Sequence, residues 1–135
     1  MLGNSPISWC SKKQGIVALS SCEAEYVAAS FAACQANWIE MLLSELKAVE
    51  VTKMKLLVDN KSAIDLANNP VSHGRSKHIE RRFHFLRDQV NKERLELDYC
   101  NTEIQLADIL TKPMKKERFD DLKKLIGMDS LENMH

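Results

Sequence analysis

The 135-residue sequence predicts an α/β fold of single-domain size, on three observations. Segments with the alternating or compact apolar patterns of strands are separated by segments with the periodicity of amphipathic helices. The apolar share of 44% is that of an ordinary globular protein, and the formal net charge is zero. No apolar run reaches the roughly 18 residues that a membrane span needs, so no membrane partner is expected.

Three short segments are predicted to form strands. Residues 6–11 alternate larger and smaller side chains, which is a short strand signal. Residues 54–58, MKLLV, form a compact apolar run typical of a buried strand. Residues 94–100 alternate two leucines and a tyrosine with charged residues, which indicates a half-exposed strand.

The longest predicted helix covers about residues 21–47. Ser20 and Glu23 match a capping box, in which Glu23 reaches back to the backbone N–H of Ser20. The apolar residues of this helix form two stripes, a broad one of larger side chains and a narrower one of alanines. We expect the broad stripe to be Val27, Phe31, Cys34, Trp38 and Leu42.

Further helices are predicted after the second strand and after the third. A helix follows Asn60, a second covers residues 77–91, and a third is opened by a capping box at Thr102. A last amphipathic helix ends at Gly127, and residues 128–135 form a polar tail. The order of strands and helices gives one domain over residues 1–127.

The amino-terminal segment and the cysteines indicate an intracellular protein. The first ten residues, MLGNSPISWC, lack the charged region and long apolar core of a secretory signal. We therefore expect a cytoplasmic or nuclear location and no secretion. The four cysteines contain no C-x-x-C pair, which favours free buried thiols over a disulfide framework or a zinc site.

Three acidic residues near the starts of predicted helices are candidate metal ligands. Glu25 is turned about 200° from Glu23 on its helix and lies on the side of the alanines. Asp59 closes the buried strand, where ligands bind in open α/β sheets, and Asp108 lies early in a helix. Taken singly, each also fits an ordinary cap or first-turn acid. Together they suggest oxygen ligands for Mg²⁺, two ions of which can hold the attacking water and leaving oxygen of a phosphodiester.

Local clusters of basic residues fit either nucleic-acid binding or an ordinary charged helix face. They comprise Lys12 and Lys13, and a second group of Arg75, Lys77, Arg81 and Arg82. Lys61 is a better candidate because it lies beside Asp59. Lys112 and the lysines after it are expected to form a solvated surface.

Three stretches closely resemble the ribonuclease H region of copia-type retrotransposon polyproteins, over about residues 5–127. They are SWCSKKQGIVALSSCEAEYVAA, LLVDNKSAIDLANNPVSHGRSKHIERRFHFLRDQV and TEIQLADILTKP. The resemblance implies a ribonuclease H-like fold, with Glu25 in EAEY, Asp59 in VDNKSA and Asp108 in LADILTK as catalytic metal ligands.

The resemblance also implies the reaction and its partners. The expected activity is hydrolysis of the RNA strand of an RNA/DNA hybrid with two Mg²⁺ ions, for which Mn²⁺ is a possible substitute, and without a small-molecule cofactor. The reverse transcriptase region of the parent polyprotein is a further expected partner. Nucleic-acid contacts are then expected from Lys12, Lys13, Asn60, Lys61, Lys77, Arg81 and Arg82.

Two departures from the family pattern bear on activity. The family's first aspartate, in a segment resembling DADWAG, lies upstream of residue 1, so we expect a fold lacking its first two strands and an impaired enzyme. Residues 101–105, NTEIQ, lack the histidine that many cellular ribonucleases H carry there, which is also the copia pattern. The alternatives are a non-catalytic module that binds nucleic acid or completes its sheet with a separate chain, and a decayed remnant that does not fold.

Overall fold

The computed structural model describes residues 6–48, 53–69 and 77–128, with residues 77–83 described by their backbone alone. The chain divides into two compact units. One comprises Val17–Cys100, and the other comprises Met1–Ile16 with Asn101–His135. The single domain over residues 1–127 remains a prediction.

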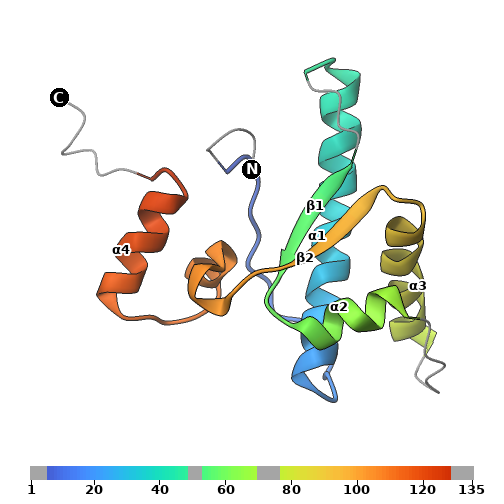
Figure 1. The fold of residues 1–135 in the computed structure, drawn as a ribbon, viewed down its shortest axis with the longest axis horizontal. Coiled ribbons are helices and arrows are strands. Elements are labelled where there is room, and N and C mark those ends of the chain that lie inside the picture. The colour runs from blue at the N-terminus through green and yellow to red at the C-terminus, as the bar shows by residue number, and fades with distance from the viewer. Residues whose placement is uncertain (1–5, 49–52, 70–76, 129–135) are drawn as a thin grey trace. The chain divides into compact units, whose positions relative to one another are not determined.

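The larger unit combines a two-stranded parallel sheet with three helices (Figure 1). Strands β1 (Met54–Val58) and β2 (Leu95–Tyr99) pair in register from Met54 opposite Leu95 to Val58 opposite Tyr99. The chain crosses from one strand to the other through helices α2 (Lys61–Asn68) and α3 (Lys77–Asn91), as a parallel pair requires. This arrangement agrees with the predicted α/β class and with the two predicted strands that form it.

Helix α1 (Ser21–Glu45) packs against β1, α2 and α3, and its buried side is not the one that hydrophobicity predicted. Val27 is buried, but the other members of the predicted stripe are exposed, Trp38 by 57%. The buried residues beside Val27 are instead Glu23, Tyr26, Ala29, Ser30 and Ala33. The prediction failed because periodicity shows which residues share a side of a helix, but not which side the neighbouring elements cover, and here β1, α2 and α3 cover the side of Tyr26 and the small residues.

The predicted strand at residues 6–11 is wrong: these residues have no regular secondary structure. Within the described ranges, β1 and β2 are the strands of the sheet. Ile7 is 45% exposed and Trp9 68% exposed. The alternating pattern therefore produces no buried face in this segment, because Ile7 and Trp9, its larger side chains, are both exposed.

The smaller unit contains two 3₁₀-helices, η1 (Thr102–Ile104) and η2 (Leu106–Leu110), and helix α4 (Lys116–Leu125). The single helix predicted to open at Thr102 is therefore wrong. Asn101 Oδ1 accepts from the N–H of Glu103 at 3.0 Å, and Gln105 Oε1 accepts from that of Ala107 at 3.4 Å. These side chains start each short turn separately, which replaces the expected capping box.

Helix α4 ends at Leu125 with Ile126 as its C-cap, two residues before the predicted end at Gly127. The N–H of Gly127 donates to the carbonyl of Lys124, and that of Met128 to the carbonyl of Lys123. Gly127 has a φ of 76°, a left-handed conformation that glycine adopts without steric cost. Within the described part of the chain, no helix has the length and apolar character of a membrane-spanning segment.

Candidate functional site

The carboxyl ends of β1 and β2 lie side by side at one end of the sheet, which we call the carboxyl edge. Asp59 lies at this edge. Val58 and Tyr99 are opposite each other as the last residues of β1 and β2, and the N–H of Cys100 donates to the carbonyl of Val58 at 3.0 Å. Asp59 follows Val58 directly and is half-buried. Ligands of open α/β sheets bind at this edge, because loops and helix starts converge there.

The N-cap of α2 is Asn60 and not Asp59. The side-chain oxygen of Asn60 accepts from the N–H of Ala63 at 3.1 Å. The ordinary capping role that the sequence also offered for Asp59 is therefore taken by its neighbour. The predicted nucleic-acid contact of Asn60 has to coexist with this cap, since one side-chain oxygen is already bonded to the helix.

Lys61 lies over the ring of Tyr99, with 4.7 Å between its Nζ and the ring centroid. Both side chains are exposed. The two residues are 38 positions apart in the sequence, and the parallel register of the strands brings them together. Sequence patterns predicted a role for Lys61 but missed Tyr99, which appeared only as part of a strand.

The amino-terminal end of α1 separates the roles of its two glutamates. Ser20 Oγ accepts from the N–H of Glu23 at 3.1 Å, and Glu23 Oε2 accepts from the N–H of Leu19 at 2.6 Å. The capping box thus forms in part. The Glu23 carboxylate accepts from the N–H of Leu19, whereas the sequence predicted that it would accept from the N–H of Ser20. Glu25 is half-buried on the same helix and belongs to the same unit as Asp59.

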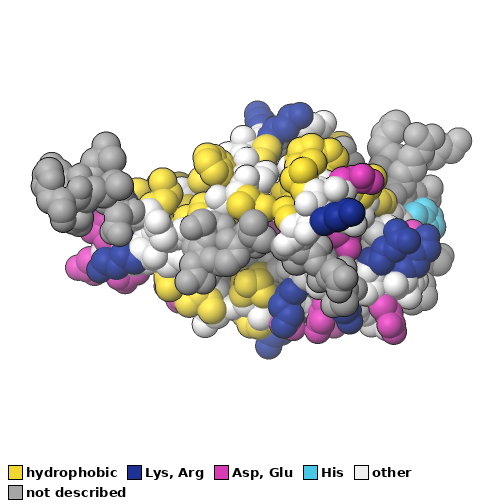
Figure 2. All heavy atoms as spheres, turned by 90° about the horizontal axis from the view of Figure 1, so that it is seen from above, with side chains coloured by type: hydrophobic (Ala, Val, Ile, Leu, Met, Phe, Trp, Pro, Cys, Tyr) yellow, Lys and Arg dark blue, Asp and Glu magenta, His cyan; other side chains and the backbone are white. Residues whose placement is uncertain are grey.

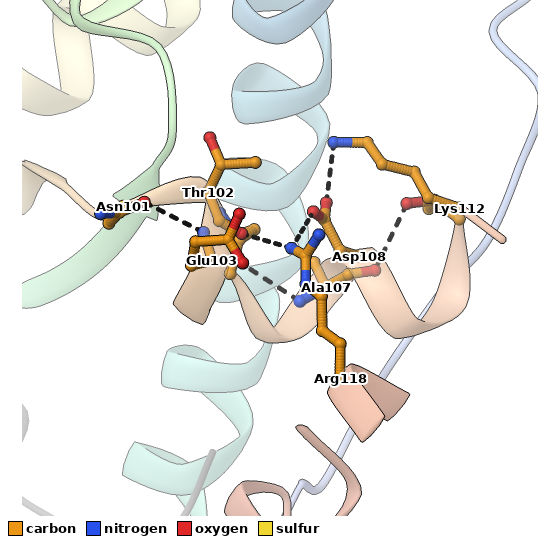
Figure 3. Close-up of polar contacts among 9 residues, drawn as sticks. Asn101, Thr102, Glu103, Ala107, Asp108, Lys112 and Arg118 are labelled. Atoms are coloured by element: carbon orange, nitrogen blue, oxygen red, sulfur yellow. Dashed lines mark hydrogen bonds and ion pairs between the residues drawn. The ribbon is translucent and has the colours of Figure 1, made fainter. Parts of the chain in front are cut away.

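Asp108 is the centre of an ion-pair cluster in the smaller unit (Figure 3). Its carboxylate is only 4% exposed. Lys112 Nζ lies 2.9 Å from Oδ1, and Arg118 Nη2 donates to Oδ2 at 3.0 Å. Arg118 also donates to the carbonyl of Thr102, so that it joins η1 to η2. Burial of a carboxylate is costly unless cations and donors surround it, and here both oxygens have a cation partner.

Two members of this cluster were not predicted from the sequence. Lys112 was expected on a solvated surface and is indeed exposed, but the pairing of its ammonium group with a buried carboxylate was not predicted. The spacing of four residues from Asp108 to Lys112 was the available signal. Arg118 gave no comparable signal, because its contact with Asp108 depends on the turn between η2 and α4.

The three predicted metal ligands fit Mg²⁺ in the chemistry of their donor atoms. Carboxylate oxygens are the ligands that Mg²⁺ prefers, and the Oδ1 atom of Asp108 already faces a cation, the Lys112 ammonium. In the parts of the chain that the structure describes, no group of three or more His, Cys, Asp or Glu side chains is arranged to hold a metal ion. Glu25 and Asp59 belong to one compact unit and Asp108 to the other.

The predicted basic contacts lie on different parts of the chain. Lys12 and Lys13 are exposed in the segment before α1. Helix α3 contains the other three, Lys77, Arg81 and Arg82, and the structure describes only their backbone. Figure 2 shows Lys and Arg side chains in small groups beside acidic ones on the face it presents.

Comparison with known proteins finds relatives along almost the whole chain. The chain is 42% identical over 127 residues to the retrovirus-related Pol polyprotein from transposon RE2 of Arabidopsis thaliana, which covers 94% of this chain and 9% of the relative. It is 40% identical over 124 residues to the corresponding polyprotein from transposon TNT 1-94 of Nicotiana tabacum, which covers 92% of this chain and 9% of the relative. The transposon Ty1-JR2 Gag-Pol polyprotein of Saccharomyces cerevisiae is 31% identical over 120 residues, with 88% of this chain and 7% of the relative covered.

The chain thus spans about 9% of the length of the plant polyproteins that it matches. No protein-family model matches it, and no solved structure does. These relatives confirm the part of the predicted resemblance that concerns retrotransposon polyproteins.

Proposed function

We propose that this chain, which is homologous to one segment of retrotransposon Pol polyproteins, is a ribonuclease H-type segment for hydrolysing the RNA strand of RNA/DNA hybrids. The observation that carries the proposal is the position of Asp59. It follows a strand of a parallel pair, at the edge where α/β proteins bind ligands, while Asn60 makes the helix cap. The motifs EAEY, VDNKSA and LADILTK support the same assignment.

In this proposal Glu25, Asp59 and Asp108 hold Mg²⁺, or Mn²⁺ in its place. When bound, two such ions supply an activated water and stabilise the charge that develops on the leaving oxygen. The chain's own residues bind and orient the hybrid. Lys12, Lys13, Lys61, Lys77, Arg81 and Arg82 are its proposed phosphate contacts, since such contacts dominate affinity for nucleic acids.

Residues 1–135 alone are proposed to cleave poorly. The resemblance places a further aspartate upstream of residue 1, and a two-metal site with fewer carboxylates holds its ions less tightly. Cleavage is therefore to be compared between residues 1–135 alone and the same residues preceded by a segment that carries the family's first aspartate.

The test uses a hybrid labelled on its RNA strand, in Mg²⁺. The chain alone, and a fusion that adds the family's first-aspartate segment before residue 1, are each compared with their Asp59→Asn and Asp65→Asn variants. Asp65 is an exposed acid of α2 and serves as the matched control. We expect little cleavage by the chain alone and cleavage of the RNA strand by the fusion. Asp59→Asn abolishes cleavage by the fusion, whereas Asp65→Asn leaves it unchanged.

Two outcomes contradict parts of this proposal. Strong Mg²⁺-dependent cleavage by the chain alone, abolished by Asp59→Asn, would show that the upstream aspartate is not needed. A folded fusion that binds the hybrid and cleaves nothing would contradict the enzymatic assignment.

The second candidate function is a non-catalytic module that binds nucleic acid or completes its sheet with a separate chain. The described sheet of two strands favours it, because a sheet of this size can be extended by a strand from another chain. The reverse transcriptase region of the parent polyprotein is the proposed partner. Such a module keeps its affinity for the hybrid when Asp59→Asn is introduced and shows no turnover in either form.

A further inference from the structure

The contact between Lys61 and Tyr99 stands at the edge where the proposed site lies. Tyr99 ends β2 opposite Val58, the residue before Asp59, and Lys61 is two residues beyond Asp59. The distance of 4.7 Å from Nζ to the ring centroid is well within the range of about 6 Å at which a cation is attracted to an aromatic face. Tyr99 is 47% exposed, so a ligand at this edge can reach the pair.

The lysines beside the sheet differ in how their charge is compensated. Lys55 Nζ lies 2.8 Å from a carboxylate oxygen of Asp98, and Lys53 Nζ lies 3.5 Å from one of Glu96. Those ion pairs leave little net positive charge for an anionic ligand. The ring under Lys61 attracts the ammonium group but carries no formal charge, so the positive charge of Lys61 remains available at the carboxyl edge.

We propose that Tyr99 is a positioning residue that holds the Lys61 ammonium at the carboxyl edge of the sheet, where it neutralises a backbone phosphate of the nucleic-acid duplex. This inference rests on the proposed function and names the residue that orients one of its phosphate contacts. A lysine side chain is long and flexible, and its ordering opposes binding. A ring that already limits the ammonium group to a few positions reduces this entropic cost.

The test measures binding of a fluorescently labelled RNA/DNA hybrid by anisotropy, in EDTA to prevent cleavage, across a series of salt concentrations. The variants are Lys61→Gln, Tyr99→Leu, Tyr99→Phe and the double variant Lys61→Gln/Tyr99→Leu. Lys55→Gln is the matched control, because it removes the same charge from the same sheet about four residues before Asp59. At roughly 3.3 Å per residue this distance exceeds a Debye length of about 8–10 Å, so its effect at the edge is screened.

The expected results separate charge from positioning. Lys61→Gln lowers the slope of log affinity against log salt by roughly 0.7–0.9, the contribution of one phosphate contact, whereas Lys55→Gln leaves the slope unchanged. Tyr99→Leu weakens binding roughly two- to fivefold, as expected from an exposed cation–π contact. Tyr99→Phe keeps the ring and binds like the wild type, and Tyr99→Leu has no further effect once Lys61 is replaced. Circular dichroism shows whether each variant is folded.

Other outcomes overturn the inference and locate the failure. A Tyr99→Leu effect of equal size with and without Lys61, or a Tyr99→Phe effect as large as that of Tyr99→Leu, removes the positioning role. Unchanged binding by Lys61→Gln in a chain that binds the hybrid removes the phosphate contact but leaves the proposed function in place. A wild-type chain that is folded and does not bind the hybrid contradicts both proposals.

Discussion

The two compact units of the chain bury apolar and charged side chains in different proportions, although each buries a carboxylate, Glu23 in the larger and Asp108 in the smaller. In the unit Val17–Cys100 the most deeply buried large residues are Tyr26, Leu86 and Leu95, so this unit is held mainly by apolar packing. In the described part of the smaller unit, two cations hold the buried carboxylate of Asp108, and the buried apolar residues are Leu122 and Ile126. A core made of apolar contacts is disrupted by lost volume, whereas an ion-pair cluster is disrupted by a lost charge.

The largest expected effect comes from lost volume in the apolar core. Leu86 of α3 is 0% exposed, and Leu86→Ala removes its contacts and leaves a cavity. We expect the free energy of unfolding to fall by about 4 kcal/mol, within the range for buried leucines. Urea unfolding followed by circular dichroism measures the change.

Leu57→Ala is the matched control for this prediction. Leu57 is 49% exposed on β1, so truncation loses little buried area, and we expect a cost of less than about 1 kcal/mol. Equal costs for the two variants would show that Leu86 does not belong to a tightly packed core.

The second effect comes from lost charge in the smaller unit. Asp108→Asn leaves Lys112 and Arg118 beside an uncharged group in a buried position, and we expect a cost of about 3 kcal/mol in that unit. Hydrogen–deuterium exchange, read by mass spectrometry for peptides of α4 and of α1, locates the loss. We expect faster exchange in α4 with little change in α1.

Asp88→Asn provides the matched comparison for an exposed ion pair. Asp88 pairs with Lys92 at 2.8 Å, and both side chains are about half exposed, 48% and 56%. An exposed pair at this spacing contributes about 0.3–0.5 kcal/mol, and its effect decreases with salt. If Asp108→Asn changed exchange in α4 no more than Asp88→Asn changes it in α3, the cluster would not stabilise the smaller unit.

The sequence predicted those features that depend on neighbours along the chain. The apolar run MKLLV matches β1 residue for residue, and the cap at Ser20 forms the start of α1. Both features depend on local patterns, hydrophobic in one case and hydrogen-bonding in the other. The helices between the two strands predicted the α/β class, and a crossover through them allows the parallel pairing that the structure has.

The features that the sequence did not predict depend on contacts between distant residues. The buried side of α1 was set by the close approach of α2 and α3, which the hydrophobicity of Trp38 and Phe31 does not report. Arg118 meets Asp108 across two 3₁₀-turns, and Lys61 meets Tyr99 through the register of the sheet. For the candidate site, the sequence therefore singled out three acids and Lys61 as predictions, but not Tyr99 or Arg118, which only the fold brings next to Lys61 and Asp108.

A third prediction concerns the pH dependence of the apolar unit. Tyr26 is 0% exposed, and burial raises the pKa of its phenol from 10.0 to about 12, against a smaller opposing effect of the Arg87 guanidinium. Because the folded-state pKa is the higher one, the stabilisation is complete below about pH 10 and is lost as the pH rises toward 12. At about 1.4 kcal/mol per pKa unit, the loss amounts to roughly 2–3 kcal/mol.

The two tyrosines of the chain allow a direct comparison. Tyr26→Phe removes this part of the alkaline loss of stability, whereas Tyr99→Phe, at an exposed position, keeps it. Unfolding free energies of the three proteins between pH 9 and 12 measure the difference, and tyrosinate absorbance identifies the group that titrates. Identical pH profiles for the wild type and Tyr26→Phe would show that Tyr26 ionises as easily when folded as when unfolded.

The smallest effect is expected at the start of α1, where the apolar unit depends on a hydrogen bond and not on buried volume. Ser20→Ala removes the hydroxyl that accepts from Glu23 N–H, and an N-cap of this kind contributes about 1 kcal/mol. Ser20→Asp restores an acceptor at the same position and recovers the stability, and Ser21→Ala, one residue into the helix, leaves it nearly unchanged. Because Glu23 also accepts from Leu19 N–H, the helix keeps one side of its capping arrangement, which limits the loss. A fall in the free energy of unfolding as large as that of Leu86→Ala would mean that the helix start determines the packing of the whole unit, and the contrast between local and core contributions would then be wrong.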